Sequence, residues 1–498
     1  MNVNPITRLD YPDPDVIRVE DTYYMVSTTM HFMPGCEILQ SFDLVHWEHV
    51  TYVYETLDHT DAQQLKSGQN IYGQGMWAAS LRYHEGRFYI CFVANDTRKT
   101  YLYTSEKIDG SWKKQLIEGF YHDGSLLFDE DGRNYIVYGN DEIWITELNE
   151  DLTAPKKDGL HRLLVSDHKN PELGYEGSHI QKINGYYYIF LVHSLRDRWM
   201  RTEACFYSDS LEGEFTGGDV LCDDRGYCGQ GVAQGGIVDT PDGKWYAMLF
   251  QDSGAVGRIP ILLPVTWKDH FPFFGQNGHV PEEIEVHSTR PGYIYQPLVG
   301  SDDFCNGLLP RWQFNHDPDP RYYHLDALQG TYTITTREVC TELTQAVNTL
   351  TQRMSYPSCA AEVTVDASAL KEGDVAGLCA LQGCYAAVGI TKHHGKYEVL
   401  MLDKKEDGIL DMTEGTVVES HQMDFRLEAD FCNMKDEARC YYRVNKGDWL
   451  PIGTVHKLYF KLDHFTGCRF GLFCYAAEET GGSACFRDFK YYDVDEIS

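Results

Sequence analysis

Five side chains that could do chemistry hold the same place in a repeated sequence pattern. Each lies 11 or 12 residues before a Tyr of an aromatic-rich segment. The five are Asp13, Trp77, Asp123, Glu176 and Gln234, and the tyrosines are Tyr24, Tyr89, Tyr135, Tyr188 and Tyr246. Three carboxylates beside an indole suit glycoside hydrolysis, in which one carboxylic acid protonates the leaving oxygen and one carboxylate activates water. A third carboxylate near the acid raises its pKa by like-charge repulsion, and the indole stacks on a sugar face.

The aromatic-rich segments predict the elements that position these side chains. They read EDTYYMVST, HEGRFYICFV, EDGRNYIVYG, INGYYYIFLV and PDGKWYAMLF, and their tyrosines are separated by 65, 46, 53 and 58 residues. A tight turn followed by an aromatic strand at such a period favours the four-stranded blades of a β-propeller over a sandwich. Because the innermost strand of every blade begins near the propeller axis, we expect the five side chains to line one pit.

Five longer motifs carry a resemblance to a known family. They are YPDPDVIRVEDTYYMVST, GMWAASLRYHEGRFY, HDGSLLFDEDGRNY, YEGSHIQKINGYYY and GGIVDTPDGKWY. Together, and in this order, they resemble glycoside hydrolase family 43, most closely its two-domain β-xylosidase/α-L-arabinofuranosidase branch. The resemblance implies a five-bladed β-propeller that hydrolyses glycosides with inversion of anomeric configuration.

The resemblance also implies roles for single residues. Asp13, within Tyr-Pro-Asp-Pro, matches the general base, and Glu176, within Glu-Gly-Ser-His, matches the general acid. Asp123, before Gly-Ser-Leu, matches the residue that tunes and orients the acid. Arg258, in VGRIPILLPVTW, matches an arginine that contacts the sugar, and Trp77 matches an aromatic wall of the sugar site.

Each of these residues also has a structural interpretation that the sequence leaves open. The structural interpretations are a turn cap for Asp13, an Asx turn for Asp123, an ion pair for Glu176, core packing for Trp77 and a solvated turn for Arg258.

The sequence departs from the family pattern at two places. Gln234 stands where related enzymes often carry a His that helps to hold a water or a cation on the propeller axis. Since Gln is a poor metal ligand, we predict no metal ligand and no cofactor for the chemistry, with a structural Ca²⁺ left as an alternative. Met30 stands where some relatives have an aromatic wall, and we expect His31 and Phe32 to compensate, although His31 is equally consistent with a structural role.

The propeller pattern ends near STRPGYIYQPL, which predicts a propeller over residues 1–297 and a second domain over 298–498. Alternating segments such as AAEVTVDA, KLYFKL and RFGLFCYA predict an antiparallel β-sandwich, and the motifs DDF and FRDFKYYDV suggest paired first and last strands. The domain resembles the concanavalin-like domain of these xylosidases. We expect it to wall one side of the pocket, with a carbohydrate-binding module as the alternative.

The composition of the chain argues against several classes of binding partner. The chain has 498 residues and a net charge of −32, which argues against nucleic acid and anionic membranes as partners. No apolar run approaches the ~20 residues of a membrane span, and the first residues do not read as a signal peptide. Fifteen cysteines without a CxxC pair favour reduced thiols and a cytoplasmic location. Homo-oligomers are left open.

The sequence therefore predicts an all-β enzyme, a five-bladed β-propeller followed by a concanavalin-like sandwich. The predicted activity is inverting exo-hydrolysis that releases terminal β-D-xylose, α-L-arabinofuranose or both from small oligosaccharides. Two alternatives remain at this point, a propeller that binds sugar without cleaving it and an enzyme that cleaves arabinan or galactan.

Overall fold

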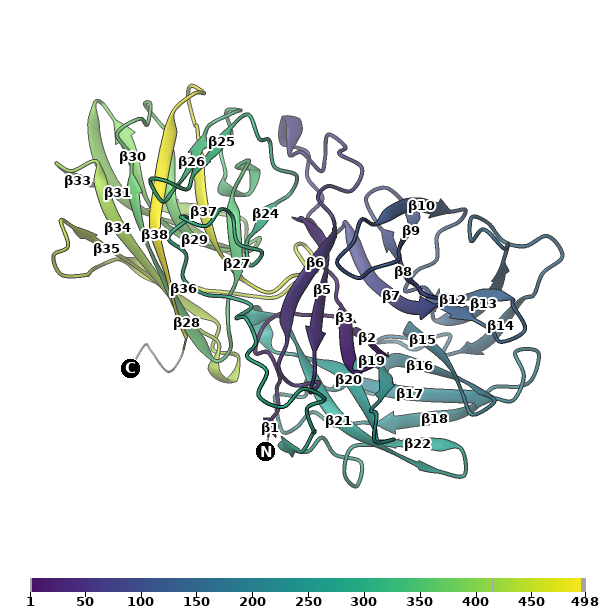
Figure 1. Ribbon diagram of the computed structural model, residues 1–498. Helices are drawn as coiled ribbons and strands as arrows, with labels where there is room; N and C mark the ends of the chain where they lie inside the picture. Colours follow the sequence, from purple (N-terminus) through teal and green to yellow (C-terminus); the bar gives the residue numbers. More distant parts are fainter. Residues whose placement is uncertain (1, 414, 494–498) are drawn as a thin grey trace.

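A computed structural model describes residues 2–413 and 415–493. It has two parts built from strands, a ring of blades and a two-sheet body beside it (Figure 1). Outside the described residues lie Met1, residue 414 and residues 494–498 of the predicted domains. Val494, the last residue of the motif FRDFKYYDV, is among them.

Residues 15–274 contain five four-stranded antiparallel sheets, the five blades. Blades 1 and 2 consist of β2 (Asp15–Val19), β3 (Thr22–Val26), β5 (Gly35–Ser41) and β6 (Glu48–Tyr54), then β7 (Met76–His84), β8 (Arg87–Ala94), β9 (Lys99–Ser105) and β10 (Lys113–Ile117). Blade 3 consists of β11 (Ser125–Phe128), β12 (Asn134–Asn140), β13 (Glu142–Leu148) and β14 (His161–Ser166). Blades 4 and 5 consist of β15 (Glu176–Ile183), β16 (Tyr186–Ser194), β17 (Arg201–Ser208) and β18 (Thr216–Leu221), then β19 (Val232–Asp239), β20 (Trp245–Asp252), β21 (Arg258–Lys268) and β22 (Phe271–Phe274).

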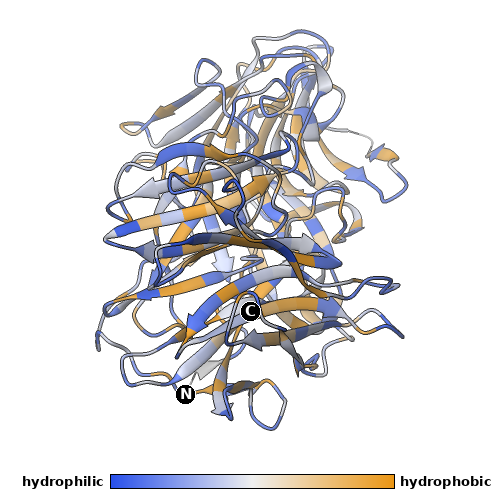
Figure 2. Ribbon diagram, turned by 90° about the vertical axis from the view of Figure 1, so that its right-hand side faces the viewer, coloured by the Kyte–Doolittle hydropathy of each residue, from blue (hydrophilic) through white to orange (hydrophobic). Residues whose placement is uncertain are grey.

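The first strand of each blade lies innermost. In turn, β2 contacts β7, β7 contacts β11, β11 contacts β15, β15 contacts β19, and β19 contacts β2, which closes the ring. The repeated tyrosines all lie on the second strand of a blade, so the prediction of five blades from their spacing is confirmed. Many of these strands carry both apolar and polar residues (Figure 2), and the apolar side chains of neighbouring blades pack together, as those of blades 3 and 4 do.

Arg82 of β7 ties the innermost strands together at the centre of the propeller. Its guanidinium donates to the carbonyls of Leu126 on β11 and Ile180 on β15, and to the carboxylate of Asp15 on β2. A mostly buried charge that is hydrogen-bonded in this way is tolerated. Four of the five blades therefore meet at one side chain.

The second part of the chain is a β-sandwich of two antiparallel sheets. The first sheet runs in the order β32 (Leu410–Met412), β31 (Lys396–Lys404), β30 (Ala386–His393), β29 (Val375–Leu381), β37 (Arg469–Tyr475), β27 (Leu350–Arg353), β24 (Gln313–Asn315) and β4 (Phe32–Met33), with β33 (Thr416–Val418) also paired to β31. The second runs in the order β25 (Tyr323–Asp326), β26 (Thr331–Thr335), β38 (Ser483–Asp493), β28 (Ser358–Asp366), β34 (Gln422–Asp430), β35 (Glu437–Val444) and β36 (Leu450–Lys457). The remaining described elements are the pair β1 (Asn2–Val3) and β23 (Glu283–Ile284) and the short 3₁₀ helices η1 (Lys66–Gly68), η2 (Gly254–Val256), η3 (Leu343–Gln345) and η4 (Cys432–Met434).

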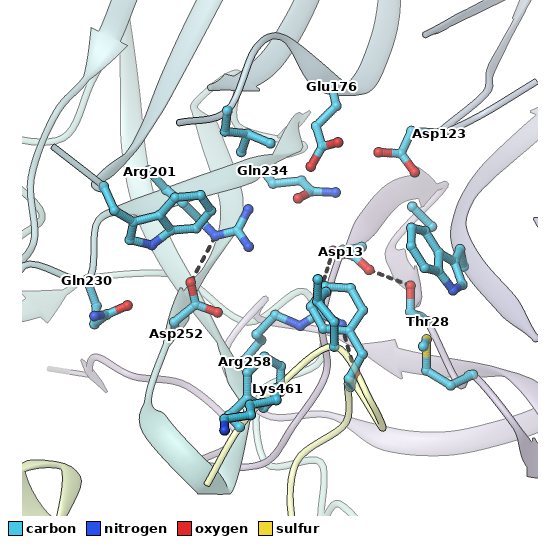
Figure 3. A pocket seen from close by; sticks show the side chains of 18 of the residues that line it. Asp13, Thr28, Asp123, Glu176, Arg201, Gln230, Gln234, Asp252, Arg258 and Lys461 are labelled. Atoms are coloured by element: carbon cyan, nitrogen blue, oxygen red, sulfur yellow. Dashed lines mark hydrogen bonds and ion pairs between the residues drawn. The ribbon is translucent and has the colours of Figure 1, made fainter. Parts of the chain in front are cut away.

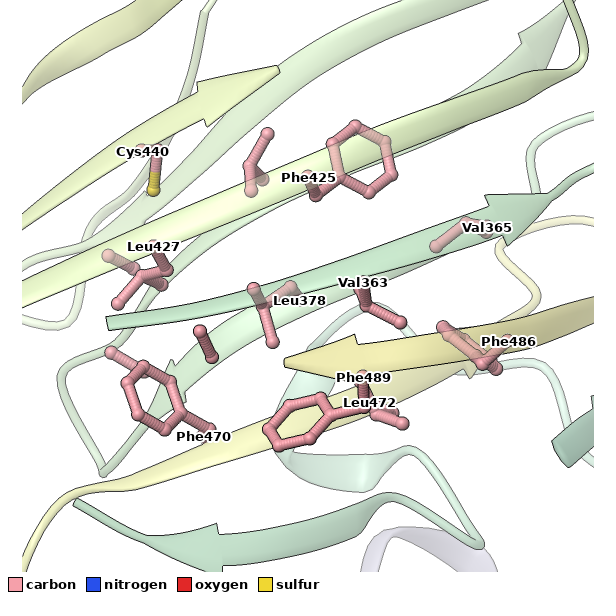
Figure 4. Packing of buried hydrophobic residues seen from close by; sticks show 14 of the residues in the cluster. Val363, Val365, Leu378, Phe425, Leu427, Cys440, Phe470, Leu472, Phe486 and Phe489 are labelled. Atoms are coloured by element: carbon pink, nitrogen blue, oxygen red, sulfur yellow. The ribbon is translucent and has the colours of Figure 1, made fainter. Parts of the chain in front are cut away.

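Aliphatic and aromatic side chains fill the space between the two sheets of the sandwich (Figure 4). Leu378 and Phe470 of one sheet and Val363 and Phe425 of the other are almost entirely buried. The same cluster includes Val256 of the propeller part, so the apolar core is continuous across the junction of the two domains.

Polar contacts also join the two domains. Arg353 of the sandwich forms a buried ion pair with Glu37 of blade 1 at 2.8 Å. The carboxylate of Asp10 accepts N–H bonds from Arg258 at 2.7 Å and from Gly467 at 2.8 Å. In addition, the short strand β4 leaves the sequence of blade 1 and pairs with β24 at the edge of a sandwich sheet. Propeller and sandwich are therefore held together by shared strands, charges and core.

Two expectations about the sandwich have different outcomes. The pairing of its first and last segments is confirmed, because Asp302 and Phe489 exchange backbone hydrogen bonds of 2.9 and 3.0 Å. The segment KLYFKL, residues 457–462, was expected to form a strand, and this is wrong: β36 ends at Lys457 and the following residues are a loop. The alternating aromatic pattern there faces a pocket between the domains, as described below.

No helix in the described part of the chain has both the length and the apolar character that a membrane crossing requires. All 15 cysteines are free thiols; Cys379 and Cys474 are buried, and Cys485 is partly exposed.

Candidate active site

A pocket of about 640 Å³ opens where the innermost strands begin, beside the sandwich domain. Residues of all five blades line it, and so do Phe460, Lys461, Leu462 and Phe465 of the sandwich domain. Figure 3 shows Asp13, Asp123 and Glu176 pointing toward one another across this space. The loop predicted as a strand is therefore one wall of the pocket, in agreement with the expectation that the second domain covers one side.

The local backbone explains how polar side chains reach the pocket from strands that bury apolar ones. The innermost strands of blades 2, 4 and 5 each begin with an irregularity in the pairing, at Trp77, Gly177 and Gln234. Such bulges re-aim side chains. Asp13 and Asp123, which precede the innermost strands of blades 1 and 3, have positive φ angles of 52° and 47°. Strained backbone of this kind is concentrated at functional sites.

Asp13 is buried and held by two donors. Arg258 donates from Nη1 to Oδ1 of Asp13 at 3.1 Å, and Thr28 donates from Oγ1 to Oδ2 at 2.6 Å. Arg258 itself is only 2% exposed, so the interpretation as a solvated turn residue is excluded. Its guanidinium carbon lies 4.3 Å from the ring centre of Phe465, which belongs to the sandwich domain. Both domains therefore fix the orientation of Asp13.

Asp123 and Glu176 lie close together with His122 between them. Nε2 of His122 is 3.5 Å from Oδ2 of Asp123 and 3.5 Å from Oε2 of Glu176. The backbone N–H of Gly177 donates to Asp123 at 3.0 Å, and the side-chain amide of Asn140 donates to Glu176 at 2.7 Å. The two carboxylates are thus oriented by fixed donors and share one imidazole.

The protonation of this group follows from its burial and charges. Burial raises the pKa of the Asp123 carboxyl to about 6; the ring of His122 opposes this shift, and the nearby carboxylates of Glu176 and Asp13 add to it. Burial disfavours the charged imidazole of His122, but the attraction of Asp123 and Glu176 outweighs burial and raises the pKa of His122 to about 9. The Asp123 carboxyl therefore takes up a proton near neutral pH while the His122 ring is charged.

The described axial residues do not fit a cation. Asp15, below the pocket, accepts hydrogen bonds from the backbone of Leu81 at 2.7 Å and from Arg82 at 2.8 Å, and faces Nδ1 of His179 at 3.1 Å. Arg82 already supplies a permanent positive charge at this place. Gln234 lines the pocket but offers only an amide, which is a weak ligand for a cation. The alternative of a structural Ca²⁺ on the axis receives no support from these residues.

One group of three described side chains, His122, Asp123 and Glu176, has its potential ligand atoms within 4.8 Å of one another, close enough to hold a metal ion. Two members of this group, Asp123 and His122, are also those whose pKa values are raised.

The expected sugar-contacting residues separate into two sets. Trp77, Gln234, Met30 and Arg258 line the pocket as expected. The centre of the Trp77 ring lies 5.8 Å from that of His122 and 5.7 Å from that of Phe465. Trp77 is therefore part of the pocket wall, and its interpretation as a core-packing residue is excluded.

His31 and Phe32 do not reach the pocket, and their expected role in sugar contact is corrected. His31 is completely buried, and its ring packs against those of Phe32, Tyr72 and His316, 4.3 to 4.8 Å away between centres. Phe32 belongs to β4, which pairs with the sandwich domain. The chain direction in β4 is fixed by this pairing, which turns both side chains into the domain junction.

Sequence reasoning missed a second group of polar residues on the far side of the pocket. Arg201 donates from Nε to Asp252 at 2.8 Å, and Gln230 lies beside this pair (Figure 3). Trp199, 43% exposed, also lines this side. Arg201 and Asp252 lie at the start of β17 and the end of β20, positions outside the innermost strands. The 12-residue offset that located the carboxylates therefore could not find them.

Comparisons with known proteins follow the same division of the chain. The family described as "Glycosyl hydrolases family 43" matches residues 3–272, more than half of the chain. The family described as "Beta xylosidase C-terminal Concanavalin A-like domain" matches residues 301–492.

Several individual proteins are similar over nearly the whole chain. A protein named beta-xylosidase from Formosa agariphila is 26% identical over 99% of this chain and 89% of its own length. A xylosidase/arabinosidase from Butyrivibrio fibrisolvens is 23% identical over 99% of both chains. Among solved structures, a bifunctional GH43-CE protein of Bacteroides eggerthii superimposes with a TM-score of 0.92 at 42% identity, covering 99% of this chain. This chain spans 64% of that longer protein.

Proposed function

The chain belongs to glycosyl hydrolase family 43, and on that premise we propose that it is an inverting exo-glycosidase of short pentose oligosaccharides. Its products would be terminal β-D-xylose, α-L-arabinofuranose or both. The observation that carries this proposal is the pocket in which Asp13 faces the pair formed by Asp123 and Glu176.

Asp13 is proposed as the general base. It takes a proton from a water molecule, whose oxygen attacks the anomeric carbon of the terminal sugar. The donors Arg258 and Thr28 each hold one of its carboxylate oxygens, which orients the remaining lone pairs toward the pocket. Positioning of this kind makes up a large part of catalysis by converting a bimolecular step into an oriented one.

Glu176 is proposed as the general acid. It gives its proton to the glycosidic oxygen while the bond from that oxygen to the anomeric carbon breaks, so the products are a free sugar and a shortened oligosaccharide. Asn140 fixes Oε2 of Glu176, and Asp123, bonded to the N–H of Gly177, lies at its side. Burial raises the pKa of Asp123 to about 6, so a proton is held beside Glu176 near neutral pH. No cofactor enters this scheme.

The shape of the pocket supports action at chain ends. The sandwich residues Phe460 to Phe465 close one side of the pocket, so a sugar chain has no path out through that wall. A volume of about 640 Å³ suits a small-molecule ligand. Names of similar proteins, beta-xylosidase and xylosidase/arabinosidase, support a pentose as the released sugar.

The test is a pair of rate measurements on aryl β-D-xylopyranoside and aryl α-L-arabinofuranoside, with the Asp13→Ala variant as the blank. We expect turnover of at least one substrate, lost in the blank, and the ratio of the two rates names the sugar preference. Proton NMR of the xylose released from the aryl β-D-xylopyranoside, before mutarotation, should show the inverted α-anomer. Release of the β-anomer would refute inversion. No turnover of either substrate would refute the pentosidase and favour an arabinan- or galactan-cleaving enzyme or a sugar-binding protein.

A further inference from the structure

His122 is a charged group of the pocket that the proposed mechanism has not used. It directly precedes Asp123 in the loop before β11, and its backbone carbonyl accepts the N–H of Gly139 at 3.0 Å. The side chain is 19% exposed. Nε2 is buried and forms no hydrogen bond of good geometry with any described residue, yet it lies 3.5 Å from both acidic side chains.

A purely structural histidine does not explain this arrangement. Buried polar atoms normally find hydrogen-bond partners, whereas Nε2 of His122 faces two carboxylate oxygens at a distance typical of charge pairing. The Trp77 and His122 rings pack edge to face, with 5.8 Å between their centres. This contact limits the positions that the ring can take.

We propose that His122 is a positioning residue of the acid site, whose protonated ring lies between Asp123 and Glu176 and holds the two carboxylates together. This inference rests on the proposed function, in which Glu176 is the general acid. When both are ionised, the neighbouring carboxylates of Asp123 and Glu176 repel each other. A cation 3.5 Å from each of them offsets this repulsion. The ring would thus keep Glu176 at the place from which it protonates the leaving oxygen.

The charges around the ring determine its ionisation. Asp123 and Glu176 contact it, and Asp13 faces it from blade 1, so three carboxylates surround it. The other cations of the pocket lining are engaged as well: Arg201 by Asp252, Arg258 by Asp13 and Lys461 by Glu406. The attraction of the carboxylates raises the pKa of His122 to about 9, so the ring is charged at neutral pH.

The positive ring has a measurable consequence for the pH dependence of the enzyme. A nearby cation favours the ionised form of a carboxylate and lowers its pKa. Removing the charge of His122 therefore lets the acid site keep its proton to a higher pH. Because the acid works only while protonated, activity is lost at the pH at which this proton leaves. The alkaline limb of the profile of kcat/KM should thus move to higher pH.

The first experiment measures kcat/KM against pH on xylobiose, whose poor leaving group needs the acid, for the wild type and for His122→Gln, His122→Phe and His122→Lys. We expect His122→Gln and His122→Phe to lose about 10- to 100-fold in kcat at pH 6, as is usual for lost positioning, and to shift the alkaline limb upward. His122→Lys should restore the wild-type limb, because it returns the charge. The control His168→Gln changes an exposed histidine outside the pocket and should leave the profile unchanged. Loss of kcat in all three variants with an unmoved limb would overturn the proposal.

A second measurement does not depend on turnover. In the full chain with ¹⁵N-labelled histidine, the ring signal that disappears in His122→Gln should titrate as an imidazolium well above pH 7. In the Asp123→Asn, Glu176→Gln double variant it should titrate at least one pH unit lower. A neutral His122 ring at pH 7 in the wild type would refute the inference even if the enzyme cleaves pentosides. A charged ring in a protein that cleaves neither substrate would refute the proposed function alone.

Discussion

Asp13 and Arg258 form a buried ion pair, in which Nη1 of the arginine donates to Oδ1 of the aspartate at 3.1 Å. Both side chains are less than a tenth exposed. The arginine is anchored from behind, since its backbone N–H is held by Asp10, and Asp10 also accepts the N–H of Gly467 in the other domain. The orientation of the proposed base therefore depends on contacts that cross the domain junction.

Arg258→Lys should lower kcat by about 10²- to 10³-fold, because a lysine keeps the charge but not the planar group that orients Asp13. Arg258→Met should also reduce stability by about 3–5 kcal/mol, since it leaves a buried carboxylate unpaired. Steady-state kinetics and thermal unfolding measure the two effects. The matched control is Arg133→Lys at an exposed pair with Asp131, which should change neither. A fully active Arg258→Lys enzyme would remove the arginine from the proposed mechanism.

Phe465→Ala should lower kcat although the residue belongs to the sandwich domain. The ring contacts Arg258 at 4.3 Å and Trp77 at 5.7 Å. Loss of a partly desolvated cation–π contact of ~1–2 kcal/mol should cost roughly 5- to 30-fold in kcat/KM. The comparison is Phe273→Ala, which removes a 49% exposed ring on β22 far from the pocket lining. Equal rates in the two variants would show that the sandwich loop only covers the pocket.

Glu176→Gln should discriminate between substrates by their leaving groups. A general acid contributes about 10²- to 10⁴-fold to the departure of a poor leaving group and little to that of a nitrophenolate. We therefore expect a large loss on xylobiose and a small one on nitrophenyl xyloside, whereas Asp13→Ala should abolish both. A Glu176→Gln enzyme with the same fractional loss on both substrates would identify another residue as the acid.

Asp123→Asn should change the pH dependence of stability. The folded-state pKa of Asp123 is raised to about 6 by burial, above the ~3.9 of an unfolded Asp. The protonated Asp123 carboxyl stabilises the folded state fully at a pH below the unfolded-state pKa, and this stabilisation is lost as the pH rises through about 6. The variant lacks this loss, so its melting temperature relative to wild type should increase from pH 4 to pH 7. Thermal unfolding in matched buffers measures the difference, and a constant difference over this range would contradict the raised pKa.

Trp199→Ala should affect oligosaccharides more than aryl glycosides. Trp199 lines the side of the pocket beyond Arg201 and is 43% exposed, as is typical of an aromatic platform awaiting a ligand. We expect KM for xylotriose to rise about 3- to 10-fold, the equivalent of ~1 kcal/mol of ring contact, with kcat/KM on aryl glycosides nearly unchanged. Leu328→Ala, at a 95% exposed side chain outside the pocket, is the control. Equal changes on both substrate types would mean that Trp199 supports the released sugar.

The repeat in the sequence was sufficient to predict the propeller and the convergence of its carboxylates. Both depend on local patterns, a turn and an aromatic strand, that recur with each blade. The pattern failed where long-range packing decides. His31 and Phe32 lie one and two residues after a pocket residue, yet the pairing of β4 with β24 turns them into the domain junction.

Two other parts of the site needed the structure. Residues 458–462 alternate like a strand, but no neighbouring strand pairs with them in the described fold, and Phe460, Lys461 and Leu462 line the pocket instead. His122 is adjacent to Asp123 in sequence, but its significance comes from Glu176, which lies 54 residues later and meets it only across two blades.

Arg258 receives its support from Phe465 and, through Asp10, from Gly467. This has a consequence for how such genes can recombine. Exchanging the coding region after residue 298 for that of a relative would replace the pocket wall and the arginine's support in a single crossover. A chimera that gains a new pocket wall, and with it a new substrate specificity, therefore also loses the support of Arg258 and with it catalytic rate. Viable chimeras should be those whose incoming loop preserves an aromatic residue at position 465 and an unhindered N–H at position 467, which gives library design a two-residue filter.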